Sequence, residues 1–352
     1  MENTYFLVVT DGGPYKSMFE FMQRDITTKF NGGFVCDKVN RTKAKIILLG
    51  DRAKKYSMGM LDFLTYEENN LYKAIESASA SYKNIVVIFN NSSLFFNKYF
   101  PYTLKKYKRR FKNLKYVLLY TDIVSSVVSS DAKYLMDKNV FDLVYSIDDN
   151  DVKKYGLLKT HTTYSIHEDY CNIKPAIDMY FCGGCIDRED ICKSIAKMAI
   201  ENNANAQIDM LCTKEFSGIK EHQQVINYLS RKDFVDYPET LKRELNAKCM
   251  LDIVRPNHIA YTLRTYEAIV YNRKILTNNK AILDLKFYDP EYIQYFENAD
   301  DIDWDWVKRD IDVDYGYNGE FSPVNLVNDI YSRLFWFKKH TIKSDTSYLC
   351  DS

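Results

Sequence analysis

The chain has 352 residues, of which 46% are hydrophobic and 27% are charged, so its composition is that of a globular protein rather than a disordered one. Lysine plus arginine equals aspartate plus glutamate at 48 each, and this balance gives no reason to expect a nucleic-acid partner. One hydrophobic core rarely serves so long a chain, and two domains are therefore expected.

The N-terminus lacks the features of a secretory signal peptide. The opening residues MENTYFLVVTDGG contain no basic region, and their apolar run is only five residues long. No stretch approaches the ~20 apolar residues that a membrane span needs. The eight cysteines are scattered along a chain much larger than a disulfide-stapled domain. These features predict a cytoplasmic protein with reduced thiols.

Short apolar runs alternate with helical patterns in the first half of the chain, which is typical of parallel α/β architecture. The expected strands are Tyr5–Val9, Lys45–Leu49, Ile85–Phe89, Tyr116–Tyr120 and Leu143–Ser146. The expected helices are Met18–Phe30, Tyr66–Ala80 and Pro101–Lys112. The polar, aperiodic segment LLKTHTTYSIHEDYCNIKP follows and ends in Pro175. These patterns predict a first domain over residues 1–165 and a linker over residues 166–176.

The alternation of strands and helices resumes after the linker and predicts a second domain over residues 177–320. The expected strands are Asp178–Cys182, Ile208–Cys212, Met250–Val254 and Lys274–Thr277. The expected helices are Arg188–Asn202, Glu221–Ser230 and Pro238–Ala247. A final helix, Pro323–Phe337, lies in a C-terminal segment over residues 321–352, and its apolar side chains on more than one face predict that it docks. Two such domains predict a ligand cleft at the carboxyl ends of their strands.

A glycine turn follows the first strand of the second domain, in MYFCGGCIDRED. Gly183 and Gly184 allow a tight turn and a close approach of the backbone. The following helix start, together with Arg188, would suit a phosphate. The alternative is an ordinary strand–helix turn with a surface arginine, because the full dinucleotide-binding pattern is missing.

Two patterns raise the question of a metal, and neither predicts one. Cys182 and Cys185 form a C-x-x-C pair that would suit half a zinc site or a redox pair, but no second pair exists, and small buried thiols are favoured. Acidic residues alternate in DDIDWDW and DIDVDYG. The second run departs from a calcium loop because Tyr315 and Phe321 occupy its sixth and twelfth positions. Both runs are expected to be solvated surface.

The segment Lys98–Lys115, KYFPYTLKKYKRRFKNLK, holds eight basic residues and no acid, interleaved with tyrosine and phenylalanine. Such a basic, aromatic surface suits contact with an anionic membrane leaflet. The alternative is an ordinary solvated helix. The balanced total charge and the absence of a recognised module argue against nucleic acid.

The stretch NHIAYTLRTYEAIVYNRK places charges at the start of an otherwise apolar helix. Thr262 is a suitable N-cap, so the N–H groups of Leu263 and Arg264 and the Arg264 guanidinium would face a diphosphate. Glu267 lies one turn further along the same side and could accept both hydroxyls of a ribose. The alternative is an internal ion pair between Arg264 and Glu267.

The segment LNAKCMLDIVRPNHIAYTLRTYEAIVYNRKILTNNK, followed by FYDP, resembles the C-terminal half of bacterial glycosyltransferases of polysaccharide and lipopolysaccharide biosynthesis. These proteins are of the GT-B type and akin to the CgeB-like family. The segment FDLVYSIDDNDVKKYGL resembles the end of their N-terminal domain. The resemblance covers about residues 115 to 300. It implies two Rossmann-like domains facing a cleft, with the acceptor met by the first and a nucleotide-diphosphate sugar held by the second.

The resemblance also implies that no metal or other cofactor is essential. It places Thr262 and Arg264 at the diphosphate and Glu267 at the ribose. The sequence departs from the family at His258-Ile259-Ala260, where relatives tend to have a small polar residue and glycine. This departure affects the part of the pocket that selects the donor sugar.

The sequence as a whole predicts a cytoplasmic glycosyltransferase, peripheral at the inner face of the cell membrane, that acts on a surface polysaccharide or lipid-linked glycan. An inverting transfer needs a base for the acceptor hydroxyl. Asp11, in the loop TDGGPYK, and His258 are the candidates, although a turn-forming aspartate and a loop histidine explain them equally well. Two alternatives stay open, namely an inactive nucleotide-binding or scaffold protein and a nucleotide-sugar epimerase.

Overall fold

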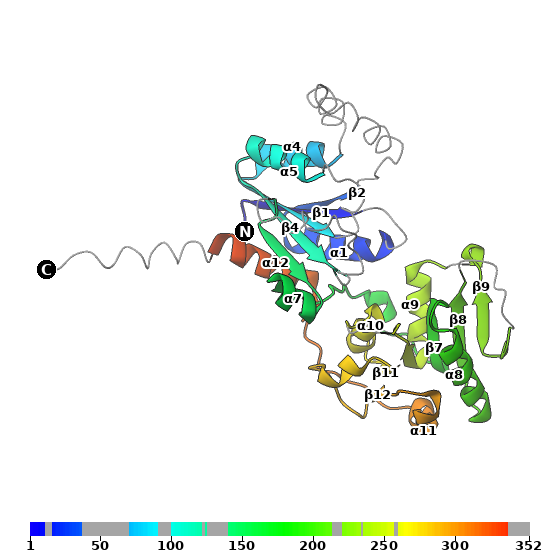
Figure 1. The fold of residues 1–352 in the computed structure, drawn as a ribbon. Helices are drawn as coiled ribbons and strands as arrows, with labels where there is room; N and C mark the ends of the chain where they lie inside the picture. Colours follow the sequence, from blue (N-terminus) through cyan, green and yellow to red (C-terminus); the bar gives the residue numbers. More distant parts are fainter. Residues whose placement is uncertain are drawn as a thin grey trace, which may run out of the picture. The chain divides into compact units, whose positions relative to one another are not determined.

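The protein is described by a computed structural model, which covers residues 1–10, 16–36, 70–90, 100–121, 124, 140–212, 220–233, 235–256 and 260–336. The chain divides into two compact units. Unit 1 contains Met1–Ser165 and the segment that begins at Phe321, and unit 2 contains Ile166–Glu320. Each unit is built on its own parallel sheet of six described strands, flanked by helices (Figure 1).

The sheet of unit 1 has the strand order β2-β1-β3-β4-β5-β6, and every described pair is parallel. Its strands are β1 Thr4–Thr10, β2 Gly32–Cys36, β3 Asn84–Asn90, β4 Leu114–Tyr120, β5 Leu143–Ser146 and β6 Leu158–Lys159. Its helices are α1 Lys16–Lys29, α4 Asn70–Ser81, α5 Phe100–Arg110 and α7 Asp149–Tyr155. The predicted strand Lys45–Leu49 lies outside the described residues.

Both faces of this sheet are buried, which explains why its central strands are continuous apolar runs. Along β3, Val87 and Phe89 point into a core that includes side chains of α4 and α5. The alternate residues Val86 and Ile88 point into a second core that includes side chains of α1. The period of two in each strand therefore divides its side chains between two helix layers.

The second core of unit 1 is completed by α12 (Pro323–Tyr331), to which the chain returns after unit 2. Val327 and Ile330 are fully buried in this core, and α12 lies against α1 (Figure 1). The Tyr145 hydroxyl donates a 2.7 Å hydrogen bond to Asp329. The prediction that the final helix docks is confirmed, although the α-helix ends at Tyr331 and continues as a π-helical turn, Ser332–Trp336.

The sheet of unit 2 has the strand order β12-β11-β10-β7-β8-β9, again with every described pair parallel. Its strands are β7 Ile177–Gly184, β8 Ala206–Leu211, β9 Ile226–Leu229, β10 Ala247–Asp252, β11 Lys274–Thr277 and β12 Ile293–Tyr295. Its α-helices are α8 Glu189–Glu201, α9 Tyr237–Leu245, α10 Leu263–Val270 and α11 Trp304–Lys308. This order is that of a doubly wound Rossmann sheet.

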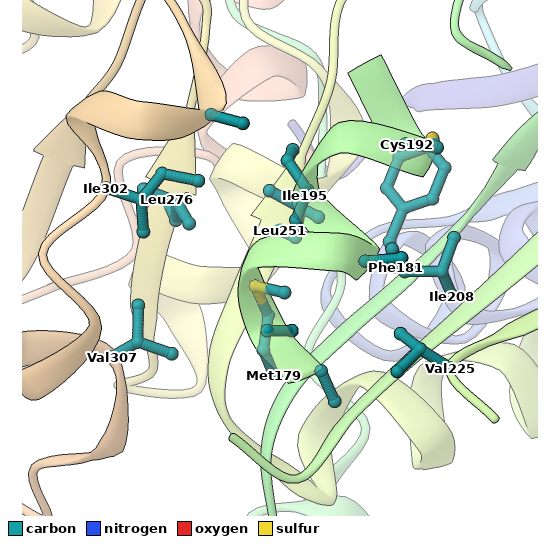
Figure 2. Packing of buried hydrophobic residues seen from close by; sticks show 14 of the residues in the cluster. Met179, Phe181, Cys192, Ile195, Ile208, Val225, Leu251, Leu276, Ile302 and Val307 are labelled. Carbon is teal, nitrogen blue, oxygen red and sulfur yellow. The ribbon is translucent and has the colours of Figure 1, made fainter. Parts of the chain in front are cut away.

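One face of this sheet packs against α8 and α11. Met179 and Phe181 of β7 meet Ile195 of α8, while Val307 of α11 closes the other end of the cluster (Figure 2). Lys274, at the start of β11, is 1% exposed and donates from Nζ to the carbonyls of Trp306, Val307 and Arg309 at the end of α11. A lysine at the C-terminus of a helix satisfies carbonyls that have no partner within the helix.

One predicted element of unit 2 is wrong. The segment Glu221–Ser230 was expected to be helical, and it contains the strand β9, Ile226–Leu229, which pairs with β8. This strand is short and lies at the edge of the described sheet, so only Ile226 at its start is buried. A four-residue edge strand shows no clear alternation of apolar residues, and pairing with its neighbour decides its conformation.

Replacing Ile330 by alanine should destabilise unit 1, because α12 buries this side chain completely. The expected loss is about 2–5 kcal/mol in the free energy of unfolding, as for large-to-small substitutions in other cores. Urea denaturation of the full chain would measure it. Ile186→Ala is the control, since Ile186 is 53% exposed in unit 2. A loss no greater than that of the control would show that α12 contributes little to this core.

Candidate functional site

The candidate site of unit 2 lies where the winding of its sheet reverses. From β7 the chain proceeds to β8 and β9 on one side, and it then returns to β10, β11 and β12 on the other. The loops that follow β7 and β10 therefore leave neighbouring strands in opposite directions. In such sheets ligands bind in the crevice at the carboxyl ends of these two strands. The glycine turn and the loop before α10 both occupy this position.

Three arginines come together at this reversal. Arg188 precedes α8, Arg264 lies in the first turn of α10, and Arg255 lies in the loop after β10. Burial, the Arg255 charge and the Arg264 charge, in decreasing order, lower the pKa of Arg188, and Asp252 opposes them only in part. The structure thus groups Arg188 with Arg264, as the sequence suggested, and adds Arg255. Its position after an apolar strand was the available signal for Arg255.

Arg188 holds its charge without an ion-pair partner in the described part of the chain. Its Nε is buried and has no hydrogen-bond partner there. Its Nη1 donates only a long hydrogen bond of 3.4 Å to the carbonyl of Gly184. A partly buried guanidinium that has no carboxylate in contact with it and lies beside two other cations is unfavourable in a ligand-free protein. An anion would supply the missing partner.

The N-termini of the two helices at this site, α8 and α10, have no side-chain caps. Thr262, the N-cap of α10, does not cap the helix, and its hydroxyl instead donates to Asp252 at 2.9 Å. Arg188, the N-cap of α8, also makes no side-chain cap hydrogen bond. Helix N-termini carry partial positive charge and backbone N–H donors, which favour anions. Both helix starts therefore add to the positive charge of the three arginines.

The two glycines of the turn differ in the space that a side chain would find at each position. A Cβ at Gly183 would lie 2.6 Å from the ring of Phe181, so glycine is required there for packing. A Cβ at Gly184 would meet nothing within 4 Å, so its backbone stays open. Asp187, further along the turn, has a φ of 61°, a conformation in which most residues are strained. Strained backbone of this kind occurs often at binding sites.

Arg264 differs from Arg188 because unit 2 fixes it on several sides. Its Nε donates to Glu244 at 2.9 Å, its Nη2 donates to the carbonyl of Cys182 at 2.6 Å, and its Nη1 lies 3.5 Å from Asp252. Its guanidinium also lies over the ring of Phe181, 5.1 Å from the centroid. Burial acts against its charge, but the carboxyl groups around it raise the pKa of Arg264 above its usual value. Arg264 is therefore a permanent, oriented cation.

Glu267 is enclosed behind Arg264. Its side chain is 2% exposed, and Oε1 accepts a 2.8 Å hydrogen bond from the Tyr237 hydroxyl. The Glu244 carboxyl group lies against it. Little of this carboxyl group is therefore open to a ribose in the described structure, and the predicted ribose contact stays a prediction. The partners Tyr237 and Glu244 come from α9, which the sequence pattern did not connect with this site.

The remaining candidates are distributed as follows. Asp11 and His258, the candidate bases, lie outside the described residues. Cys182 and Cys185 are free thiols, and burial raises the pKa of Cys182 to about 11. Asp303 caps α11 through a 3.0 Å hydrogen bond from the Trp306 N–H. Within the described ranges, no group of three or more histidine, cysteine, aspartate or glutamate side chains could hold a metal ion.

No family model matches the sequence, and no curated protein matches it either. Several solved structures share its fold. An α-glucosyltransferase in complex with UDP and a 13-mer DNA superposes with a TM-score of 0.55 at 13% identity, over 96% of this chain and 98% of that one. A glycosyltransferase from Rickettsia africae gives 0.54 at 11% identity, over 96% and 100%. A Listeria monocytogenes protein, provisionally described as a UDP-N-acetylglucosamine 2-epimerase, gives 0.51 at 7%, over 95% and 97%.

These similarities show the fold of the chain. It has the GT-B fold, with two parallel Rossmann-like α/β units. The chain spans 58% of TarM, a longer protein, but the TM-score of 0.47 is too low to support an inference. The resemblance to CgeB-like proteins gains no support beyond the fold itself, since no family model matches.

Replacing Arg188 by methionine should stabilise the ligand-free protein. The substitution keeps an unbranched, flexible side chain and removes a charge beside Arg255 and Arg264 that has no ion-pair partner among the described residues. The expected gain is about 0.5–2 kcal/mol, as when binding groups are neutralised in other proteins. Thermal denaturation in a buffer free of multivalent anions would measure it.

Lys197→Gln is the matched control, because Lys197 lies on the same helix with its side chain 63% exposed. If Arg188→Met lowers the melting temperature, the guanidinium stabilises unit 2 in the absence of an anion, which would contradict the interpretation of Arg188 as part of an anion site.

Proposed function

We propose that the protein is a glycosyltransferase that transfers a sugar from a nucleoside-diphosphate-sugar donor to a surface polysaccharide or lipid-linked glycan. The donor diphosphate would bind at the three arginines of unit 2. The observation that carries the proposal is Arg188, a partly buried cation without a carboxylate partner among the described residues. It lies beside Arg255 and Arg264, where the winding of a Rossmann sheet reverses.

The chemistry of glycosyl transfer gives this cluster a role. The bond between the sugar and the diphosphate breaks in the transition state, and negative charge develops on the leaving diphosphate. Guanidinium groups and helix N-termini fixed at this position stabilise that charge without having to reorganise. Arg264 is oriented in advance by Glu244 and Cys182. Arg188 and Arg255 would complete the contact with the second phosphate, because arginine matches phosphate geometry with two donors.

The acceptor hydroxyl must lose a proton during the transfer. Asp11 and His258 remain the candidate bases from the sequence, and Glu267 remains the predicted contact for ribose. If no base acts, the protein binds its nucleotide without turnover, as expected of a scaffold. If it is an epimerase, the same diphosphate site serves, and the donor changes with no acceptor present.

A thermal-shift screen of nucleoside-diphosphate sugars tests the proposed site directly. At least one donor should raise the melting temperature of the wild-type protein. Arg188→Gln and Arg255→Gln should each weaken its binding by about ten- to a hundred-fold, since a charge-assisted hydrogen bond contributes about 1.5–3 kcal/mol. Calorimetric titration would give the affinities. Lys197→Gln should bind like wild type.

Activity then separates the candidate functions. Release of free nucleoside diphosphate only when a glycan acceptor is present indicates transfer, whereas conversion without an acceptor indicates an epimerase. Activity should persist in EDTA, because arginines and helix starts would provide the positive charge that a metal provides elsewhere. Loss in EDTA with recovery in magnesium or manganese would instead favour a metal role for Asp301–Asp305. Equal affinities of wild type and both arginine variants would refute the diphosphate site.

We also propose that α5 and the turn after it contact an anionic membrane leaflet. Part of this basic segment is already paired within unit 1. Lys108 and Lys115 both bind Asp142, at 2.7 and 3.0 Å, and Arg110 binds Glu76 at 3.2 Å. Arg109 and Lys112 are exposed at the end of the segment. Among the described helices, none is long and apolar enough to cross a membrane.

Arg109→Gln combined with Lys112→Gln should reduce co-sedimentation with phosphatidylglycerol vesicles at low salt. Each basic residue near an anionic leaflet contributes about 1 kcal/mol, so losing two should weaken association by roughly thirty-fold. High salt should weaken wild-type binding as well, because the Debye length falls from about 10 Å at 0.1 M to about 3 Å at 1 M. Lys197→Gln with Lys232→Gln is the control. Wild-type protein that stays in the supernatant at low salt would contradict the membrane contact.

A further inference from the structure

The surroundings of Arg264 contain more acidic groups than one cation can balance. Glu244, Asp252 and Glu267 are 2%, 1% and 2% exposed, and all three surround the same guanidinium. Three buried carboxylates around a single buried cation would leave an excess of negative charge in a medium of low polarity. Such an excess is strongly unfavourable unless one of the groups is neutral.

Asp252 has a hydrogen-bond donor for each of its oxygens. Its two oxygens accept hydrogen bonds of 2.9 Å from the hydroxyls of Thr262 and Thr277, one to each oxygen. It also faces Arg264 at 3.5 Å. A carboxylate with donors on both oxygens and a cation nearby is stabilised in its charged form. The neutral group must therefore be one of the two glutamates.

Glu244 of α9 and Glu267 of α10 lie close enough for their carboxyl groups to share a hydrogen bond. An ionised carboxylate only accepts hydrogen bonds, so two carboxyl groups can bond to each other only when one is protonated. Glu244 accepts the 2.9 Å hydrogen bond from Arg264 and is the ionised partner. Burial, followed by Glu244, raises the pKa of Glu267 well above its usual value. The proton therefore belongs on Glu267.

We propose that Glu244 and Glu267 hold one proton between them at neutral pH, that Glu267 carries it, and that the neutral acid positions Glu244 to orient Arg264. Glu244 is then a positioning residue for the candidate site, and Glu267 supports it from behind. The proton itself does not depend on the proposed function. Only its consequence does, because a second negative charge beside Arg264 would weaken the binding of a diphosphate.

Other titratable groups surround the pair, and among the described residues none supplies a second cation to Glu267. The groups that face the pair or its arginine are Tyr237 on α9, Tyr180 and Cys182 on β7, Asp252 at the end of β10, and Arg188 and Arg264 beyond it. Burial raises the pKa of Tyr180 and of Cys182, so both stay neutral. They do not titrate in the range where Glu267 is expected to ionise.

The sign of the pH dependence follows from the direction of the shift. Glu267 has a raised pKa in the folded protein, so its protonation stabilises the fold fully below the ordinary pKa of a glutamate. That contribution is lost as the pH rises through the raised folded-state pKa. Carboxylates paired with lysines, such as Asp142, whose pKa is lowered, act in the opposite direction and at lower pH. A loss of stability between mildly acidic and mildly alkaline pH, below the range of Tyr180 and Cys182, is therefore expected from a group such as Glu267.

Glu267→Gln is the informative variant, because an amide can accept from Tyr237 and donate to Glu244 just as a protonated acid does. The melting temperature of wild type should fall from mildly acidic to mildly alkaline pH, and the variant should lose most of this fall. Glu267→Ala should lower the melting temperature throughout, so that glutamine rescues what alanine loses. Glu239→Gln, on α9 with its side chain 46% exposed, should keep the wild-type pH dependence.

Infrared spectroscopy gives a second, direct measurement that does not require a variant to be stable. Wild type at neutral pH should show the carbonyl band of a protonated carboxyl group, which disappears as the pH rises and is missing in Glu267→Gln. Pyrophosphate is the probe for the consequence at the site. Its affinity for wild type should fall over the same pH range, and its affinity for Glu267→Gln should change much less.

The outcomes separate the two proposals. If Glu267→Gln shows the same alkaline loss of stability as wild type, or if no protonated-carboxyl band is found, the shared proton is refuted. If neither pyrophosphate nor any nucleotide binds at any pH, the proposed function fails, and the melting and infrared measurements still decide where the proton lies. If pyrophosphate binds with the same pH dependence to wild type and variant, Glu244 does not position Arg264 through this proton.

Discussion

The candidate site of unit 2 depends on one constraint, the guanidinium of Arg188, which has no ion-pair partner among the described residues. It lies beside two other arginines at the reversal of a parallel sheet, with a buried Nε that has no partner among the described residues. No gain in folding stability explains such a grouping of like charges, because repulsion and desolvation both act against it. The glycine turn and the uncapped helix starts around it point in the same direction, since each adds donors or open backbone for an anion. A function that requires negative charge at this position explains all of these features together.

The three arginines are held in different ways, and the difference is informative. Arg264 is fixed by Glu244, by the carbonyl of Cys182 and by the ring of Phe181. The side chain of Arg188 makes a long hydrogen bond to the carbonyl of Gly184, and Arg255 lies in an exposed loop position. A preorganised cation loses no entropy when a ligand arrives, whereas a less restrained one can adapt to the ligand that is present. Arg264 would therefore give the diphosphate a fixed contact, and Arg188 and Arg255 would adjust to the position of the second phosphate.

Much of the fold could be predicted from the sequence, because buried parallel strands are apolar runs that stand out between helices. The strands β5 and β11 were predicted with the bounds that the structure has, and the docking of the final helix followed from its apolar faces. The sequence indicated candidate residues only where local spacing carries the information, as for Arg264 and Glu267 on one helix, and their roles stay predictions. Glu244 and Tyr237 lie 20 and 30 residues away from their partners along the chain, and only tertiary packing connects them. The edge strand β9 was missed because pairing, not its own pattern, makes it a strand.

The buried acids explain how unit 2 can hold a charged site at the edge of an apolar core. Arg264 alone would require a counter-charge within the protein, and Glu244 and Asp252 supply it. Two ionised acids against one cation leave a local negative charge, which Arg188 and Arg255 then offset from the solvent side. If Glu267 were ionised as well, the acids and the arginines would balance, and a diphosphate would meet no net positive charge. The neutral state of Glu267 therefore decides whether the cluster attracts an anion, although Glu267 itself lies behind the arginines and is almost completely buried.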